Sequence, residues 1–382
     1  MSKVHITLVG GQPAPVYHGI VATQPDYVFY VCSRSADSKR AQKVLKKVLK
    51  NIPCSCYFLD PTDPVTIKAF TESLAERFKN DEVTVNISGG LKSWTYWFSI
   101  VFEKQPNATI VYMDQNNVLW NYRTMEASAD FEFDMHTLFR LYRNPLDNYT
   151  LFSEYTEDDF NAISQIESCR VFNYDDFNKL TTVVPKYVQK KIRTNAVGEQ
   201  HLLASKSYVI WEKNLPDGIQ SVELCIYDEN EDYVKEVIKA PHAVELAFFA
   251  GWFECKVAKL LSSWNHTRKI YMNCHFPFKE GVDKNEVDII IDTGTKILFV
   301  ECKTQIHDTT AIEKFRSVIK GYGGTASKGL FVTDAKMTEI ALAKCKEHGI
   351  LTFSLQDEHA GKSTEEAIVA LLDAELYNIN AR

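Results

Sequence analysis

The segment "VDIIIDTGTKILFVECKTQ", residues 287–305, decides the fold of the C-terminal part of the chain. Two runs of β-forming residues flank a Thr-Gly-Thr turn, so we expect a β-hairpin. Side chains alternate along a strand, which places Glu301 and Lys303 on one face of the second strand. Asp288 of the first strand can then lie beside Glu301. Two neighbouring carboxylates repel each other unless a positive charge lies between them, and a hard divalent cation would supply that charge.

A helix is predicted over residues 242–261, and it offers a third carboxylate. Residues spaced four and three apart mark one small, mostly apolar face of this helix: Ala247, Gly251, Glu254, Ala258 and Leu261. Glu254 therefore lies in a stripe that should face the sheet. Because an unpartnered buried carboxylate is costly, Glu254 also requires a cation or a lysine nearby.

Carboxylates that hold Mg²⁺ or Mn²⁺ beside a lysine suit one kind of chemistry. The metal lowers the pKa of a bound water, and the lysine orients that water or stabilises charge on a phosphorane. The pattern predicts metal-assisted phosphodiester hydrolysis. The alternative is a surface hairpin whose charges are solvated, but the runs IIID and ILFV are too apolar for an exposed ribbon.

This arrangement resembles the PD-(D/E)xK nuclease superfamily, in which a helix carboxylate and a strand Asp precede a Glu-x-Lys triplet. The resemblance implies an α/β, restriction-endonuclease-like domain. It also implies a catalytic set of Glu254, Asp288, Glu301 and Lys303. The implied metal ligands are Asp288, Glu301 and Cys302, and the implied metal is Mn²⁺ or Mg²⁺.

The first third of the chain alternates between apolar strands and helices. Strands are predicted over residues 4–10, 27–33, 54–60, 82–89 and 108–114, and helices over 36–50, 64–79 and 91–103. Nearly continuous apolar strands separated by helices predict a parallel sheet covered on both faces, which is a Rossmann-like domain. In such a sheet, ligands bind outside the carboxyl ends of the strands.

The loop with the clearest binding character is "NISGGLKSW", residues 86–94. Its two glycines let the backbone approach a ligand, the helix N-terminus presents N–H groups, and Lys92 adds a charge. It is not a Walker loop, and no G-x-G-x-x-G follows the first strand. A tight strand-to-helix turn with an incidental lysine is the simpler interpretation.

The first domain resembles the CARF domain of type III CRISPR accessory effectors, and the whole chain resembles the Card/Can group, in which a CARF domain is fused to a nuclease. The motifs that carry this resemblance are NISGGLKSW, FFAGWFECKV, NEVDIIID and ECKTQ. It implies a homodimer that binds one cyclic oligoadenylate, with cyclic tetra-adenylate as the expected ring. Ring binding would activate a nuclease that hydrolyses single-stranded DNA or RNA, or nicks DNA. The implied ring contacts are Gly11, Gln12, Pro13, Ser33, Arg34, Ser88, Gly89, Gly90, Leu91 and Lys92.

Three parts of the chain are expected: a sensor domain over residues 1–145, a connecting region of unassigned fold over 146–240, and a nuclease domain over 241–382. Two other functions remain open. A nucleotide-sensing regulator could bind DNA without cutting it, but the four catalytic residues are intact. A restriction or repair endonuclease would need a basic first domain, whereas residues 60–79 are acidic.

The composition of the chain restricts the kinds of partner that the protein is expected to bind. A net charge of −7 argues against extensive non-specific binding to duplex DNA, although a local basic groove is compatible with it. Basic residues on the predicted helices either line a phosphate groove or face solvent: Lys256, Lys259, Lys314, Arg316 and Lys320. The nine cysteines are scattered and predict reduced thiols. The N-terminus enters a strand without a signal-peptide pattern, and no long apolar run is present, so we expect a cytoplasmic protein without a membrane partner.

Overall fold

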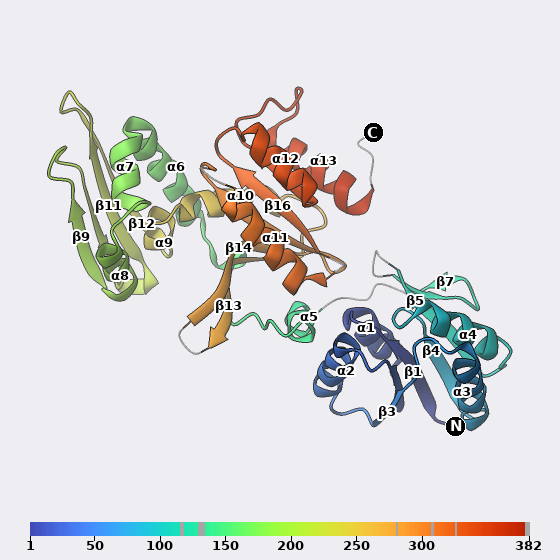
Figure 1. The fold of residues 1–382 in the computed structure, drawn as a ribbon. Helices are drawn as coiled ribbons and strands as arrows, with labels where there is room; N and C mark the ends of the chain where they lie inside the picture. Colours follow the sequence, from blue (N-terminus) through green and yellow to red (C-terminus); the bar gives the residue numbers. More distant parts are fainter. Residues whose placement is uncertain (115–117, 129–133, 280–281, 307–308, 325–326, 379–382) are drawn as a thin grey trace.

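The computed structural model describes residues 1–114, 118–128, 134–279, 282–306, 309–324 and 327–378 (Figure 1). Its strands form three sheets: seven strands in the N-terminal part, four in the middle part and six in the C-terminal part. No helix within these ranges combines the length and the apolar character needed to cross a bilayer.

The N-terminal sheet has the order β3-β2-β1-β4-β5-β6-β7. Its strands are β1 (Lys3–Val9), β2 (Tyr27–Cys32), β3 (Cys54–Phe58), β4 (Glu82–Asn86), β5 (Ala108–Met113), β6 (Leu119–Asn121) and β7 (Glu126–Ala127). Strands β1 to β5 pair in parallel, as predicted, while β6 and β7 add an antiparallel edge.

Helices cover both faces of this sheet. They are α1 (Ala14–Thr23), α2 (Ala36–Val48), α3 (Pro64–Arg77) and α4 (Lys92–Glu103). Apolar side chains of α1 and α2 share one cluster with β2, and those of α3 and α4 share another with β1 and β4. Strand β1 lies between β2 and β4, so the chain reverses its direction of winding between β1 and β4. A crevice at such a reversal is where open α/β sheets bind ligands.

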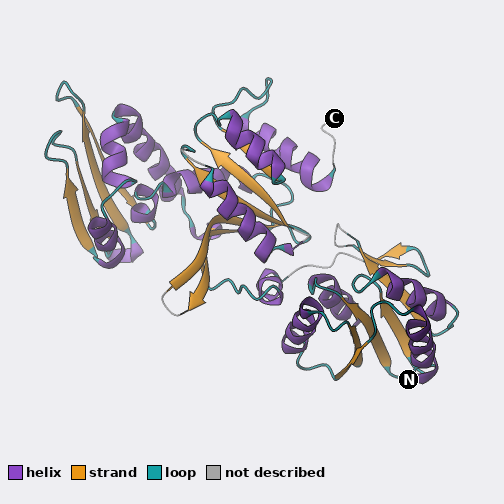
Figure 2. Ribbon diagram, viewed as in Figure 1, coloured by secondary structure: helices purple, strands orange, loops and turns teal. Residues whose placement is uncertain are grey.

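The region expected to be a connection is itself folded. It contains α6 (Glu157–Phe172), α7 (Tyr174–Thr181), α8 (Lys186–Thr194) and the antiparallel strands β9 (Val197–His201), β10 (Tyr208–Glu212), β11 (Gln220–Tyr227) and β12 (Tyr233–Ala240). Figure 2 shows the helices on one side of this sheet. Its core is continuous with the C-terminal part, because α6, β10 and β11 share one apolar cluster with α10.

The C-terminal sheet has the order β17-β16-β15-β14-β13-β8. Its strands are β8 (Asn148–Leu151), β13 (Lys269–Lys279), β14 (Val282–Asp292), β15 (Ile297–Lys303), β16 (Ser327–Thr333) and β17 (Ile350–Ser354). The expected hairpin is present as the antiparallel pair β14–β15, and β15, β16 and β17 run parallel. Strand β8 comes from the range expected to connect the domains, yet it forms an edge of this sheet.

Helices also cover both faces of the C-terminal sheet. Helices α10 (Gly251–Ser262) and α13 (Thr364–Tyr377) pack on one face, and α11 (Thr310–Tyr322) and α12 (Glu339–Glu347) pack on the other. The sheet is therefore buried on both sides, which explains why its central strands are apolar throughout.

Helix α5 (Met135–Leu141) joins the N-terminal part to the C-terminal sheet. Its buried side chains belong to a cluster that also contains residues of α1, α2, β13 and β15. Phe139 is fully buried there, with its ring centroid 5.2 Å from that of Phe276 and 6.1 Å from that of Phe299. The two parts are thus linked by a packed core as well as by the chain.

The prediction of one continuous helix over residues 242–261 was wrong. The structure has a short helix α9 (Ala243–Ala247), a turn, and then α10. Phe249 and Ala250 adopt left-handed backbone angles (φ 56° and 66°), which end the first helix. The turn brings Gly251 against the carbonyl of Glu245, where a Cβ atom would overlap the oxygen. Ala247 therefore does not share a helical face with Glu254.

We expect Gly251→Ala to lower the free energy of unfolding by about 1–3 kcal/mol, because the added methyl group must displace backbone at the start of α10. Urea unfolding followed by circular dichroism measures this. Gly321→Ala is the matched control, since a methyl group there meets no atom within 4 Å and the change should be neutral or stabilising. Equal stability of the two variants would contradict the close packing of this turn.

Candidate active site

The β14–β15 hairpin brings three of the expected site residues together. Ile289 pairs with Val300, so the next position along each strand places Asp288 beside Glu301. Lys303 Nζ lies 2.8 Å from Glu301 Oε1 and 3.5 Å from Asp288 Oδ2. Asp288 Oδ2 also accepts the backbone N–H of Cys302 at 2.7 Å. One ammonium group therefore bridges two carboxylates at the end of an apolar strand.

Helix α10 contributes Glu254 from the opposite face of the sheet. Burial raises the pKa of Glu254 well above its ordinary value, and the charge of Asp288 raises it further. Lys303 opposes this effect, while Glu286 and Glu301 add to it. Because these charges act on Glu254, the carboxyl group belongs electrostatically to the same cluster.

The same crowding acts on Glu301 and Lys303. Burial and the charge of Asp288 raise the pKa of Glu301 to about 7, although Lys303 lowers it. Burial alone would lower the pKa of Lys303, but Asp288 and Glu301 outweigh burial and raise it above its ordinary value. Lys303 is therefore charged at neutral pH, and it does not neutralise all the carboxyl groups around it.

Cys302 contributes through its backbone and not through its thiol. The thiol is buried in the apolar cluster that includes α10, and burial raises its pKa well above the ordinary value. The backbone N–H donates to Asp288, and the carbonyl oxygen accepts from Lys303 Nζ at 3.1 Å. Of the atoms of Cys302, the carbonyl oxygen is thus the one suited to a hard cation.

The donor set fits Mn²⁺ or Mg²⁺ chemically. Both ions prefer carboxylate and carbonyl oxygens. Burial and the charge of Asp288 raise the pKa values of Glu254 and Glu301, and a bound cation would favour the charged form of both groups. Within the described ranges, no three His, Cys, Asp or Glu side chains are already arranged as a ligand set. Lys303 accounts for this at the hairpin, because its ammonium lies within ion-pair distance of both Asp288 and Glu301.

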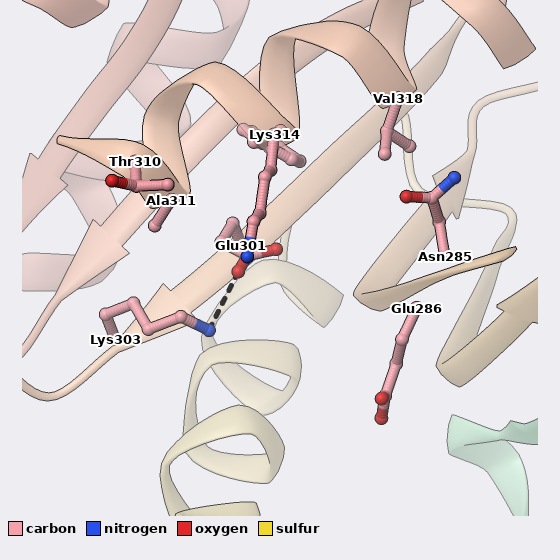
Figure 3. Close-up of a pocket in the computed structure, with 9 residues that line it drawn as sticks. Asn285, Glu286, Glu301, Lys303, Thr310, Ala311, Lys314 and Val318 are labelled. Carbon is pink, nitrogen blue, oxygen red and sulfur yellow. Dashed lines mark ion pairs between the residues drawn. The ribbon is translucent and has the colours of Figure 1, made fainter. Parts of the chain in front are cut away.

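A pocket of about 430 Å³ opens beside these residues (Figure 3). Strand residues and one face of α11 line it: Asn285, Glu286, Glu301, Lys303, Thr310, Ala311, Lys314, Phe315 and Val318. Figure 3 shows Lys314 reaching down from α11 toward Glu301, and Asn285 on the other side of the pocket. Asn285 and Thr310 were not singled out by the sequence, because their contribution depends on how α11 lies over the hairpin.

The loops after β1 and β4 meet at the reversal point of the N-terminal sheet. Gly89 packs against the carbonyl of Leu8, and a Cβ atom on it would lie 3.2 Å from the backbone nitrogen of Gly10. Gly90 has φ 79°, which favours glycine. Gly89 is thus required by a close approach of backbone to backbone, and Gly90 by its backbone conformation and by the side chain of Leu8, which lies where a Cβ atom would be.

The other expected ring contacts differ in their exposure and in the hydrogen bonds that their side chains already form. Arg34, Leu91 and Lys92 are exposed. The hydroxyl of Ser88 accepts the backbone N–H of Met113 at 2.7 Å, so its role here is structural. Ser33 Oγ lies 2.8 Å from Ser35 Oγ at the start of α2, Pro13 is buried, and Gly11 is exposed. Gln12 Oε1 accepts a hydrogen bond of 2.8 Å from the hydroxyl of Tyr142, which follows α5.

No family model matches the sequence, and no curated protein matches it. Solved structures do match along almost the whole chain. Can2 from Sulfobacillus thermosulfidooxidans, in complex with cyclic tetra-adenylate, has a TM-score of 0.63 and 16% identity, covering 98% of this chain and 99% of that chain. Protein VC1899 from Vibrio cholerae has a TM-score of 0.67 and 14% identity, covering 98% of both chains.

A third match is a type III CRISPR defence DNA nuclease activated by cyclic oligoadenylate. Its TM-score is 0.56 at 13% identity, with 96% of this chain covered. The match covers 52% of that chain, so the present protein spans about half of its length. The fold that the Card/Can resemblance implies for the two ends of the chain is confirmed. The matched structures also cover the middle of the chain.

In the absence of divalent cations, we expect Glu254→Gln to raise the free energy of unfolding by about 1 kcal/mol or more, because an amide does not have to be neutralised on burial. Urea unfolding at neutral pH with a chelator measures this. Glu347→Gln, at an exposed position of α12, is the control and should change stability little. A loss of stability on Glu254→Gln would mean that the carboxyl group forms a bond the fold needs.

Proposed function

We propose that the protein is a metal-dependent nuclease that a cyclic oligoadenylate, with cyclic tetra-adenylate as the expected ring, switches on. The observation that carries the proposal is the cluster of Asp288, Glu301 and Lys303 at the mouth of a pocket, with Glu254 on the adjacent helix. The match to Can2, whose structure holds cyclic tetra-adenylate, and to a nuclease activated by cyclic oligoadenylate supports the ligand and the activity.

The catalytic roles follow from charge and position. Asp288, Glu301 and the carbonyl oxygen of Cys302 would hold Mn²⁺ or Mg²⁺, which would supply Lewis acidity at the phosphate and a more acidic water. Lys303 is protonated, so its ammonium acts as a donor that orients a water or offsets charge on the non-bridging oxygens. Glu254 would act on this cluster through its charge, since it raises the pKa of Lys303.

The ring is proposed to bind the loops after β1, β2 and β4, at Gly11, Gln12, Pro13, Ser33, Arg34, Ser88, Gly89, Gly90, Leu91 and Lys92. Glycines allow a close approach of backbone N–H groups to phosphates, and Arg34 and Lys92 add charge. A ring with two-fold symmetry suits a homodimer in which both copies present the same loops. The substrate would be single-stranded DNA or RNA, or a DNA strand that is nicked.

Cleavage assays test the activity directly. We expect labelled single-stranded DNA, single-stranded RNA or supercoiled plasmid to be cut with Mn²⁺ or Mg²⁺ when cyclic tetra-adenylate is added. Glu301→Ala should lower the rate about a thousandfold, because metal-ion stabilisation is worth several kcal/mol. Cleavage that does not depend on the ring would contradict the proposed sensor role of the N-terminal part. A chain that binds the ring but cuts nothing would instead be a regulator that binds nucleic acid.

The Tyr142–Gln12 hydrogen bond supports coupling between the sensor and the nuclease. It joins a proposed ring contact in the loop after β1 to the segment after α5. We propose that ring binding draws Gln12 away from Tyr142. Tyr142→Phe should then raise cleavage without ring about fivefold and tighten ring binding by a similar factor, because one hydrogen bond of about 1 kcal/mol no longer opposes the change. The measurements are the basal rate and the ring dissociation constant.

Tyr208→Phe is the matched control, since it removes a tyrosine hydroxyl that donates to Glu223 at 2.7 Å in the middle sheet. It should leave the basal rate and the ring affinity unchanged. If Tyr142→Phe also changes neither quantity, the bond is equally strong in both states and does not contribute to the switch.

A further inference from the structure

Two hollows lie end to end along α11. The first is the active-site pocket, and the second has a volume of about 630 Å³ between the sensor part and the C-terminal sheet. Asn285 lines both of them. Helix α11 lines the first with Lys314 and Val318 and the second with Ser317 and Gly321. The active-site pocket therefore continues toward the sensor part as an interdomain cavity.

Three segments of the chain build this interdomain cavity. The N-terminal part contributes the loop after β1 and one side of α2, the end of α5 and the residues after it contribute residues 141–144, and the C-terminal part contributes Asn285 and α11. Asn144 Nδ2 donates to the carbonyl of Gly321 at 2.9 Å, which joins the segment after α5 to α11. Asn285 Nδ2 donates to the hydroxyl of Tyr322 and joins β14 to α11.

The charge of the cavity lining is suited to phosphate. Arg40 and Arg143 line it, and Asp37, which lies 3.8 Å from Arg40, is its only acidic lining residue among those described. Arg143 is exposed, and among the described residues no carboxylate lies within 4.0 Å of its guanidinium. It also has φ 63°, a conformation that costs an ordinary residue roughly 1–2 kcal/mol. The turn after α5 thus holds an arginine at the cavity in a strained backbone conformation.

We propose that the interdomain cavity binds the sugar-phosphate backbone of a single-stranded nucleic-acid substrate next to the scissile bond, with Arg143 as a phosphate contact. The strand would run along α11, from Lys303 and Lys314 at the active site to Arg143 at the far end. A hollow of about 630 Å³ is within the size range of ligand pockets, so it can hold a nucleotide of a single strand. This inference rests on the proposed nuclease function, since it names the path of that enzyme's substrate.

Binding in the absence of cleavage provides the test. The probe is a fluorescent single-stranded DNA oligonucleotide, titrated with full-length protein in a chelator and followed by anisotropy at several salt concentrations. Arg143→Gly removes the guanidinium while suiting the left-handed backbone, so the fold should be retained. We expect its dissociation constant for the oligonucleotide to rise about three- to tenfold, and the slope of log K against log salt to fall by about 0.7. Arg143→Lys should restore most of the affinity.

Lys206→Gly is the matched control, because Lys206 is an exposed cation with φ 68° in the middle part of the chain. It should leave oligonucleotide affinity and the salt slope unchanged. In cleavage assays with ring and Mn²⁺, Arg143→Gly should raise KM with little change in kcat, as expected for a contact made equally in the ground and transition states.

Three outcomes would overturn the inference. Unchanged oligonucleotide affinity and KM for Arg143→Gly would exclude the contact. An equal loss for Lys206→Gly would show a non-specific charge effect. Weaker binding of cyclic tetra-adenylate, with unchanged oligonucleotide binding, would assign the cavity to phosphates of the ring. The proposed function fails in a different way: wild-type protein would then show no ring-dependent cleavage, whatever Arg143 binds.

Discussion

The constraint that the packing of the C-terminal part has to meet is the partly buried ion pairing of Lys303 with Asp288 and Glu301. Burying charged groups costs several kcal/mol each, and here one ammonium serves several carboxyl groups. Such a cluster persists only where the surrounding structure fixes it. The apolar middles of β14 and β15 set the register, and α10 and α11 close the two faces of the sheet. The charges lie where the hairpin leaves this core, so the packing holds a site that is unfavourable by itself.

Helix α5 joins the N-terminal part and the C-terminal part into one packed unit. Without its buried face, the two sheets would be connected by chain alone, and relative motion would be the default expectation. Phe139 instead packs against β13 and β15, while the residues after α5 bond to the loop after β1 and to α11. A change at the ring loops can therefore reach the helix that forms one wall of the active-site pocket. Ligand binding shifts the two states only through contacts that differ between them.

The sequence was sufficient for those features that local pattern determines. Strand alternation placed Glu301 and Lys303 on one face, and the strand–helix order of the first third predicted the parallel sheet. Features that depend on long-range packing were not predictable in this way. The break between α9 and α10 follows from left-handed angles at Phe249 and Ala250, two residues whose types do not signal a turn. The sheet of the middle part was left unassigned because β9 and β12 carry mixed polar and apolar residues, and β8 was not predicted because its partner lies far along the chain. Asn285 and Arg143 line hollows that exist only once α11 and α5 are in place.

The interdomain cavity also gives a physical reason for the proposed sensor part to lie beside the proposed nuclease part. Gly11 and Pro13 belong to the proposed ring loops and line the same cavity as Arg143. A ring that moves this loop changes the wall against which a substrate strand would lie. Binding of the two ligands is then linked through a shared surface, and the linkage must be reciprocal: the strand affects the affinity for the ring by the same factor as the ring affects affinity for the strand. The positions of α5 and α11 then matter for the proposed activity as much as the proposed catalytic residues do. They determine whether the ring and the substrate contact the same wall of the interdomain cavity.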